Sequence, residues 1–162
     1  MRLPKRKNIR LKDYDYSQNG AYFVTVCTKD RKQLLWRVGA TCGRPQDEIL
    51  SSIGKLVDNE IKKLSSVYEN VSIAKSVIMP NHVHMIILIA NDDRRPEDAP
   101  TVSRIMQQFK GSLTKQAGCS LWQKSFYEHI IRDEQDYNEI WSYIDTNPLK
   151  WAEDKYYDES QE

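Results

Sequence analysis

The chain has 162 residues, of which 40% are hydrophobic and 29% charged, and its formal net charge at pH 7 is +1. This length suits one globular domain with a buried core. The three cysteines are widely separated and suggest neither a disulfide framework nor a thiolate metal site. Because the longest apolar run, residues 85–90, is too short to cross a membrane and residues 1–12 hold no apolar secretory stretch, we expect a cytoplasmic protein.

Strands are expected where β-branched and aromatic residues concentrate, and helices where apolar residues recur at intervals of three and four. In chain order these are a strand at 21–28, a helix of about five turns from Glu48, strands at 71–79 and 82–90, a helix capped by Thr101, a strand at 127–132, and a last helix that Asp133 or Glu134 opens and Pro148 closes. Residues 39–46 and 91–100 have the composition of loops.

This order of elements is typical of an α+β, ferredoxin-like (βαββαβ) fold, with an antiparallel sheet, two helices on one face and here an additional C-terminal helix. We assign residues 21–151 to this domain, residues 1–20 to a basic N-terminal arm and residues 152–162 to an acidic C-terminal tail. The fold hosts many functions and by itself predicts no reaction.

Charge is distributed unevenly between the two ends of the chain. Residues 1–12 carry six basic side chains and no acid, whereas residues 153–162 carry five acids and one lysine. A basic arm suits nucleic acid, because cations beside phosphates release condensed counterions. A solvated terminus explains the same run equally well, so charge alone does not decide.

The sharpest motif is the pair His82 and His84 within Met-Pro-Asn-His-Val-His. Residues two apart on a strand point to the same face, so both imidazoles project together. Two exposed polar residues would be the ordinary explanation of such a pair. In a strand otherwise built of Met, Ile and Leu, however, adjacent rings need partners, and a metal or a phosphate would supply them. His129, the third histidine, is expected in the core, with support of the site as the alternative.

The last helix presents a second candidate group. Its apolar stripe comprises Tyr137, Ile140, Trp141 and Ile144, and Tyr143 lies about 100° away from the centre of that stripe. Asn147 follows one turn later on the same side. A surface tyrosine and a helix-ending asparagine before Pro148 would explain both residues without a site.

Together with the histidines, the pair supplies what a metal-assisted tyrosine nucleophile requires. A phenol with a pKa near ~10 is a poor nucleophile at neutral pH. A divalent cation would polarise and orient a DNA phosphate for attack by Tyr143. The Asn147 carboxamide could complete the site beside the two imidazoles, and such nitrogen and oxygen ligands suit magnesium or manganese.

At these residues the chain resembles a known family. His82-Val83-His84 resembles the HUH motif, and Tyr143 with Asn147-Pro148 is similar to the single-tyrosine transposases of the HUH endonuclease superfamily. Segments 126–133 and 143–150 resemble especially the branch associated with repeated extragenic palindromic (REP) elements, and the likeness runs from about residue 22 to residue 151.

The resemblance implies a metal-dependent endonuclease and transposase that nicks and rejoins single-stranded DNA near a REP-like hairpin. Tyr143 would form a 5′-phosphotyrosine and release a 3′-hydroxyl, while His82, His84 and Asn147 would hold the ion. Many relatives have glutamine at the position of Asn147, and asparagine is shorter. Relatives include monomers and interlocked homodimers, and the REP-like branch slightly favours a monomer.

A few residues are candidates for contact with DNA. Lys110 resembles a basic family position, with a solvated helix face as the alternative. Trp122 and Trp36 could stack on unpaired bases, although core packing is favoured for both. The arm offers hairpin-backbone contacts through Arg6, Lys7 and Arg10.

Three other readings stay open. A non-catalytic ferredoxin-like nucleic-acid binder would use aromatics on its central strands, where this chain has His82 and His84. A metal-dependent hydrolase would leave Tyr143 incidental. HUH replication initiators and relaxases carry similar motifs but are usually larger.

Overall fold

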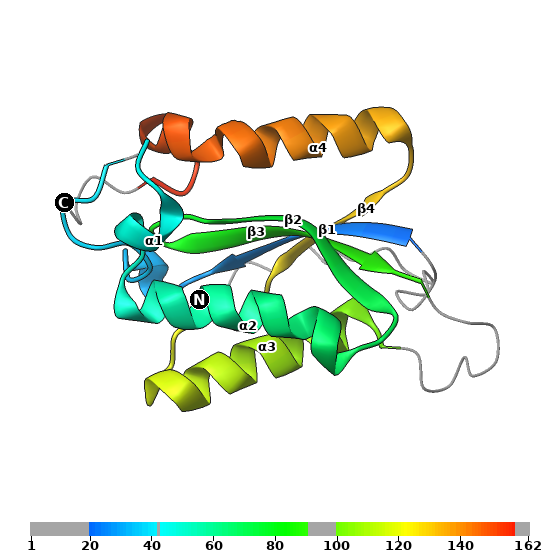
Figure 1. Cartoon of the computed structure of the whole chain (residues 1–162), viewed down its shortest axis with the longest axis horizontal. Helices are drawn as coiled ribbons and strands as arrows, with labels where there is room; N and C mark the ends of the chain where they lie inside the picture. The colour runs from blue at the N-terminus through cyan, green and yellow to red at the C-terminus, as the bar shows by residue number, and fades with distance from the viewer. Residues whose placement is uncertain (1–19, 42, 91–99, 158–162) are drawn as a thin grey trace, which may run out of the picture.

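The computed structural model describes residues 20–41, 43–90 and 100–157. It contains a four-stranded sheet with helices on both faces (Figure 1). The strands are β1 (Gly20–Cys27), β2 (Val71–Ile78), β3 (His82–Ile89) and β4 (Tyr127–Ile131). The helices are α1 (Gln46–Ile49), α2 (Ser52–Val67), α3 (Val102–Ala117) and α4 (Glu134–Thr146), with 3₁₀ helices η1 (Lys29–Arg31) and η3 (Asn147–Glu153).

The sheet has the order β2-β3-β1-β4, and every neighbouring pair is antiparallel. This arrangement confirms the ferredoxin-like expectation, because each crossover helix returns the chain past one intervening strand. The two central strands, β1 and β3, are dense in β-branched and aromatic residues, which suit a surface packed on both sides.

Helices α2 and α3 cover one face of the sheet, and α4 covers the other (Figure 1). On β1, alternate side chains point to opposite faces, so Val24 and Val26 face α2 and α3 while Thr25 faces α4. The apolar stripes of α2 and α3 close the larger part of the core, which includes Tyr22, Val24, Val26, Val57, Ile61, Leu64, Met85, Ile87, Ile105, Phe109 and Leu113.

The expected five-turn helix from Glu48 is interrupted in the structure. A single turn, α1, ends at Ile49, and α2 begins after Ser51, whose side-chain oxygen accepts a hydrogen bond from the amide of Gly54 at 3.0 Å. Such a cap satisfies an amide that has no partner within the helix. The interruption lets Leu50 pair with Trp36 as an isolated bridge, a contact that the helical periodicity does not register.

The remaining helix boundaries agree with the capping signals of the sequence. Thr101 caps α3 by accepting from the amide of Arg104, and Asp133 caps α4 by accepting from the amide of Asp136. Helix α4 ends at Thr146, just before Pro148 as expected, and the chain continues as the 3₁₀ helix η3 with this proline in its first turn. None of the helices among the described residues has the length and apolarity needed to cross a membrane.

Candidate active site

His82 and His84 lie side by side on the face of β3 that α4 covers. Their side chains are fully buried, and their Nε2 atoms are 3.0 Å apart. Because residues i and i+2 of a strand share a face, this proximity follows directly from the His-Val-His spacing. Val83 points into the opposite layer, where it joins the hydrophobic core.

The amide of Asn81 fixes the tautomer of His82. Its Nδ2 donates to the carbonyl oxygens of Tyr156, at 2.7 Å, and Arg31, at 3.2 Å, so its Oδ1 must face the imidazole. That oxygen is 2.8 Å from Nδ1 of His82 and can only accept, so Nδ1 carries the proton. The lone pair of Nε2 is therefore free to bind a cation.

Thr25 holds the second imidazole from the neighbouring strand. The register pairs Thr25 with His84, and Oγ1 of Thr25 is 2.7 Å from Nδ1 of His84. A hydroxyl can donate or accept. When it accepts from Nδ1, His84 also directs an Nε2 lone pair toward His82, which is the arrangement that a metal ligand needs.

Helix α4 is attached to the sheet near both ends, and this attachment positions Tyr143. Near its first turn, Asp136 is 2.8 Å from Nε2 of His129 on β4. Near its last turn, Asp145 is 2.7 Å from the ammonium of Lys75 on β2. His129 is 39% exposed, so the expectation of a core histidine is wrong: its ring reaches a carboxylate on α4 instead.

Tyr143 lies over the histidine pair, although the two are far apart in sequence. The centroid of its ring is 5.2 Å from that of His84 and 6.2 Å from that of Phe23, whose edge-on contact supports it from the sheet. The tyrosine keeps 38% of its surface exposed. The side chain thus contacts the buried imidazole of His84 while remaining accessible to a ligand from solution.

A third ionisable group, Asp154, completes the cluster. Its side chain is 1% exposed, its Oδ2 is 3.7 Å from Nε2 of His82, and one ligand atom from each of His82, His84 and Asp154 lies within 4.8 Å of the others. The chain reaches this position directly after η3, where Oδ1 of Asp154 accepts from the amide of Tyr156 at 2.8 Å. The charge pattern of the sequence predicts Asp154 in a terminal acidic tail, whereas in the structure its side chain is buried beside His82.

Burial controls the protonation of the site. It lowers the pKa of His84 to about 3 and the pKa of His82 well below its usual range, and the positive charge of Lys155 acts in the same direction on both. Both rings are therefore neutral near pH 7. Burial and the carboxylate of Asp154 raise the pKa of Tyr143, whereas a hydrogen bond with Asn147 lowers it, so the phenol keeps its proton.

Asn147 interacts with the phenol of Tyr143 and with the imidazole of His82. It is 5% exposed, and its interactions with His82 and Tyr143 contribute to the pKa shifts of both. Its Oδ1 and the Oδ2 of Asp154 are buried oxygens without a hydrogen-bond partner among the described residues. Buried acceptors of this kind are costly unless something satisfies them.

This donor set fits a small divalent cation. Two imidazole nitrogens and a carboxylate oxygen lie within 4.8 Å of one another, and the buried carboxamide oxygen of Asn147 is a further candidate ligand. Nitrogen and oxygen ligands of this kind suit magnesium or manganese. Adjacent ligands of an octahedral ion at about 2.1 Å lie about 3.0 Å from one another. The two Nε2 atoms, at 3.0 Å, already have this spacing.

Comparison with known proteins connects this geometry to a family. No protein-family model matches the chain. An uncharacterized protein of Haemophilus influenzae is 33% identical over 94% of the chain and 93% of its own length. The REP-associated tyrosine transposase of Escherichia coli K12 is 26% identical over 83% of the chain and 70% of its own length. A solved structure of a REP-associated tyrosine transposase bound to a REP hairpin matches 90% of this chain and 76% of the solved chain. The two are 26% identical, and the TM-score is 0.65.

The chain belongs to the REP-associated tyrosine transposases. This family is a branch of the single-tyrosine HUH transposases, as the His-Val-His strand and the tyrosine helix indicated. Its members are DNA-processing enzymes.

Three of the residues considered for DNA contact have other partners in the structure. The ammonium of Lys110 donates to the carbonyl oxygens of Gln123 and Lys124 and thereby ties α3 to the segment that leads into β4. Trp122 is 6% exposed and packs against Phe109. Trp36 is likewise buried, and its Nε1 donates to the carbonyl oxygen of Ile78 at 2.7 Å. Both tryptophans thus follow the core alternative.

The basic residues Arg6, Lys7 and Arg10 lie outside the described residues. Four further residues at the site, Thr25, Asn81, Asp154 and Tyr156, are not predicted by the sequence patterns. The ring centroid of Tyr156 lies 4.6 Å from that of His82. Only Asn81 had a local signal, because it directly precedes the histidine pair. The others reach the site through strand register or through the return of the chain after η3.

Proposed function

We propose that this transposase is a metal-dependent single-stranded DNA endonuclease that nicks and rejoins DNA through a 5′-phosphotyrosine intermediate. The nucleophile is the phenolic oxygen of Tyr143. The ion, magnesium or manganese, is held by His82 and His84 together with Asp154, and Asn147 supplies a further oxygen.

One observation carries the proposal: the ring of Tyr143 lies 5.2 Å from the ring of His84 within a single folded chain. A nucleophile must stand beside the group that activates the phosphate, and the exposed side of Tyr143 leaves room for a DNA strand. Because one chain supplies both the histidines and the tyrosine, the geometry supports a monomer acting alone.

The bound ion supplies Lewis-acid polarisation of the scissile phosphate and withdraws charge from its oxygens. The residues of the chain orient it. Asn81 and Thr25 hold the two imidazoles so that each can direct Nε2 at the cation, and the buried oxygens of Asp154 and Asn147 gain a partner that the protein does not otherwise provide.

The reaction exchanges one ester for another. The oxygen of Tyr143 forms a bond to phosphorus and loses its proton, while the bond from phosphorus to the 3′-oxygen breaks and that oxygen gains a proton. The hydrogen bond from Asn147, which lowers the pKa of Tyr143, assists the loss of the phenolic proton. Because the phosphotyrosine preserves the ester, attack by the 3′-hydroxyl of a second strand rejoins DNA without an external energy source.

The substrate we propose is single-stranded DNA beside a hairpin. The solved family member with a TM-score of 0.65 is bound to a REP hairpin, and the present chain shares its fold over 90% of its length. The same likeness supports hairpin recognition here.

The deciding experiment compares Tyr143→Phe with Tyr137→Phe, a matched change on the same helix. The probe is an end-labelled hairpin with single-stranded flanks, taken from palindromic DNA beside the gene. We expect Tyr143→Phe to abolish nicking and the covalent protein–DNA adduct on a denaturing gel while hairpin affinity stays within a few-fold, and Tyr137→Phe to retain both activities. Residual adduct in Tyr143→Phe would reject this nucleophile, and an absent adduct in the wild type would favour a hydrolase or a DNA binder.

A further inference from the structure

Lys155 occupies a defined position between two aromatic rings at the edge of the site. Its Nζ lies 5.6 Å from the ring centroid of Tyr127 and 5.0 Å from that of Tyr156. Cation–π contacts of this length restrain an ammonium that would otherwise move freely in solvent. The residue remains exposed, so the group is held in place and still accessible.

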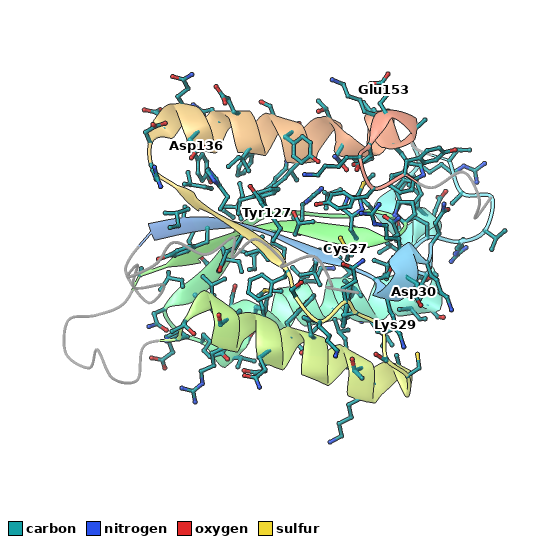
Figure 2. The ribbon with its side chains drawn as sticks, turned by 180° about the vertical axis from the view of Figure 1, so that it is seen from behind. Cys27, Lys29, Asp30, Tyr127, Asp136 and Glu153 are labelled. Carbon is teal, nitrogen blue, oxygen red and sulfur yellow. The ribbon has the colours of Figure 1, made fainter. Side chains whose placement is uncertain are left out.

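The strand register connects this ammonium to the reacting groups. Thr25 of β1 pairs with His84 on one side and with Tyr127 on the other, so these three side chains form a row on the face that α4 covers. The ring of Phe23 lies edge-on to both Tyr127, at 6.3 Å, and Tyr143, at 6.2 Å. Figure 2 labels Tyr127 at the start of β4, between the sheet and α4.

The charge of Lys155 is not neutralised by an ion pair with any residue in the described part of the chain. Its neighbour Asp154 turns into the cluster and lies 3.7 Å from His82. The same short segment therefore directs an anion toward the proposed ion and a cation toward the surface. Lys155 also acts on the imidazoles through space, since its charge lowers the pKa of both His82 and His84.

We propose that Lys155, held by Tyr127 and Tyr156, forms a subsite for a backbone phosphate of single-stranded DNA next to the phosphate that Tyr143 attacks. This inference rests on the proposed function, because it requires a DNA strand to pass over Tyr143. Lysine binds phosphate as a point charge and needs no fixed geometry from its ligand. A cation beside the reacting phosphate would set the position of the strand, so Lys155 is a positioning residue.

The test removes one charge from each partner. Binding is measured with a single-stranded-flanked DNA hairpin carrying a neutral methylphosphonate at one flank position at a time. The proteins are Lys155→Gln, Lys155→Met, Lys155→Arg and, as a control of equal charge change, Lys55→Gln on the exposed side of α2, across the sheet. All variants carry Tyr143→Phe so that the DNA stays intact, and circular dichroism verifies their folding.

We expect Lys155→Gln and Lys155→Met to reduce the slope of log affinity against log salt by about 0.7, the value for one single-strand phosphate contact. Lys155→Arg and Lys55→Gln retain the slope. At one flank position, the methylphosphonate should weaken DNA binding by the protein that keeps Lys155. The same substitution should not change the DNA affinity of Lys155→Gln. A merely structural lysine would not show this coupling to a single phosphate.

Two results would contradict the proposed subsite. One is an unchanged salt slope in both Lys155→Gln and Lys155→Met. The other is a loss of affinity from the methylphosphonate that adds to the loss from Lys155→Gln at every flank position. Nicking is followed separately in proteins that keep Tyr143. Nicking by the wild type without phosphate coupling at Lys155 rejects only the subsite. Coupling in a protein that forms no covalent adduct rejects the nuclease mechanism and leaves the phosphate contact standing.

Discussion

Asn81 accepts a hydrogen bond from Nδ1 of His82 at 2.8 Å, and this contact leaves the other ring nitrogen of His82 directed at His84. The two donations of Asn81 to carbonyl oxygens bring together three distant parts of the chain: the end of η1, the start of β3 and the segment after η3. In Figure 2 the labelled Asp30 of η1 and Glu153 of η3 lie toward the same end of the molecule.

Replacing Asn81 should therefore weaken metal binding without removing a ligand. We expect Asn81→Ala to lower the affinity for Mn²⁺ by about 10- to 100-fold, the usual effect of losing a group that orients a ligating histidine. Isothermal titration calorimetry measures it. Asn138→Ala, an exposed asparagine on α4, is the control and should bind as the wild type does. Equal affinities in the two variants would contradict the orienting role.

Asp154 should contribute more to metal binding than Asn147, because its carboxylate carries a full negative charge. We expect Asp154→Asn to reduce Mn²⁺ affinity by at least about tenfold and Asn147→Ala to reduce it less. Glu153→Gln changes the adjacent, exposed acid and serves as a matched control. If Glu153→Gln and Asp154→Asn were indistinguishable in calorimetry, Asp154 would not be a ligand.

The buried histidines predict a loss of stability in acid. In the unfolded chain each imidazole has its ordinary pKa of 6.5, whereas folding lowers the pKa of His84 to about 3. The unfolded state thus binds more protons, and the metal-free protein should lose stability as pH falls from about 6.5 toward 3, by about 1 kcal/mol per pH unit for each such histidine.

Urea unfolding between pH 7 and 4.5 measures this dependence. We expect the double variant His82→Gln, His84→Gln to show a shallower decline than the wild type, because neither replacement titrates. Parallel curves for the two proteins would show that other groups cause the acid sensitivity.

Gly54 and Gly111 should respond in opposite directions to alanine. A Cβ on Gly54 would lie 2.1 Å from the backbone oxygen of Leu35, so Gly54→Ala must displace α2 and should cost about 1–3 kcal/mol. Gly111, inside α3, has no atom within 4 Å of such a Cβ. Gly111→Ala should stabilise by about 0.5–1 kcal/mol, because alanine loses less backbone entropy in a helix. Thermal unfolding tests both, and stabilisation by Gly54→Ala would contradict the close approach.

Patterns local in sequence predicted the parts of the site that depend on local geometry. The period of a strand sets His82 and His84 on one face, and the period of a helix separates Tyr143 from the apolar stripe of α4. The ferredoxin-like order followed from the same periodicities. The prediction of one continuous helix from Glu48 was wrong at Leu50. There the helix is interrupted and Leu50 pairs with Trp36, a contact between separate segments that helical periodicity does not reveal.

By itself, then, the sequence determined the fold class, the histidine pair and the helix-borne tyrosine, because each depends on spacings of a few residues. Only the tertiary structure decided that Asp154 and Lys155 approach the site and that Lys110 ties α3 to the segment before β4. A terminal charge run has the same composition whether it stays in solvent or folds back. The hydrogen bonds of Asn81 to Tyr156 and of Lys110 to Gln123 hold such segments in place. Because each bond joins residues far apart in sequence, no periodic pattern predicts it.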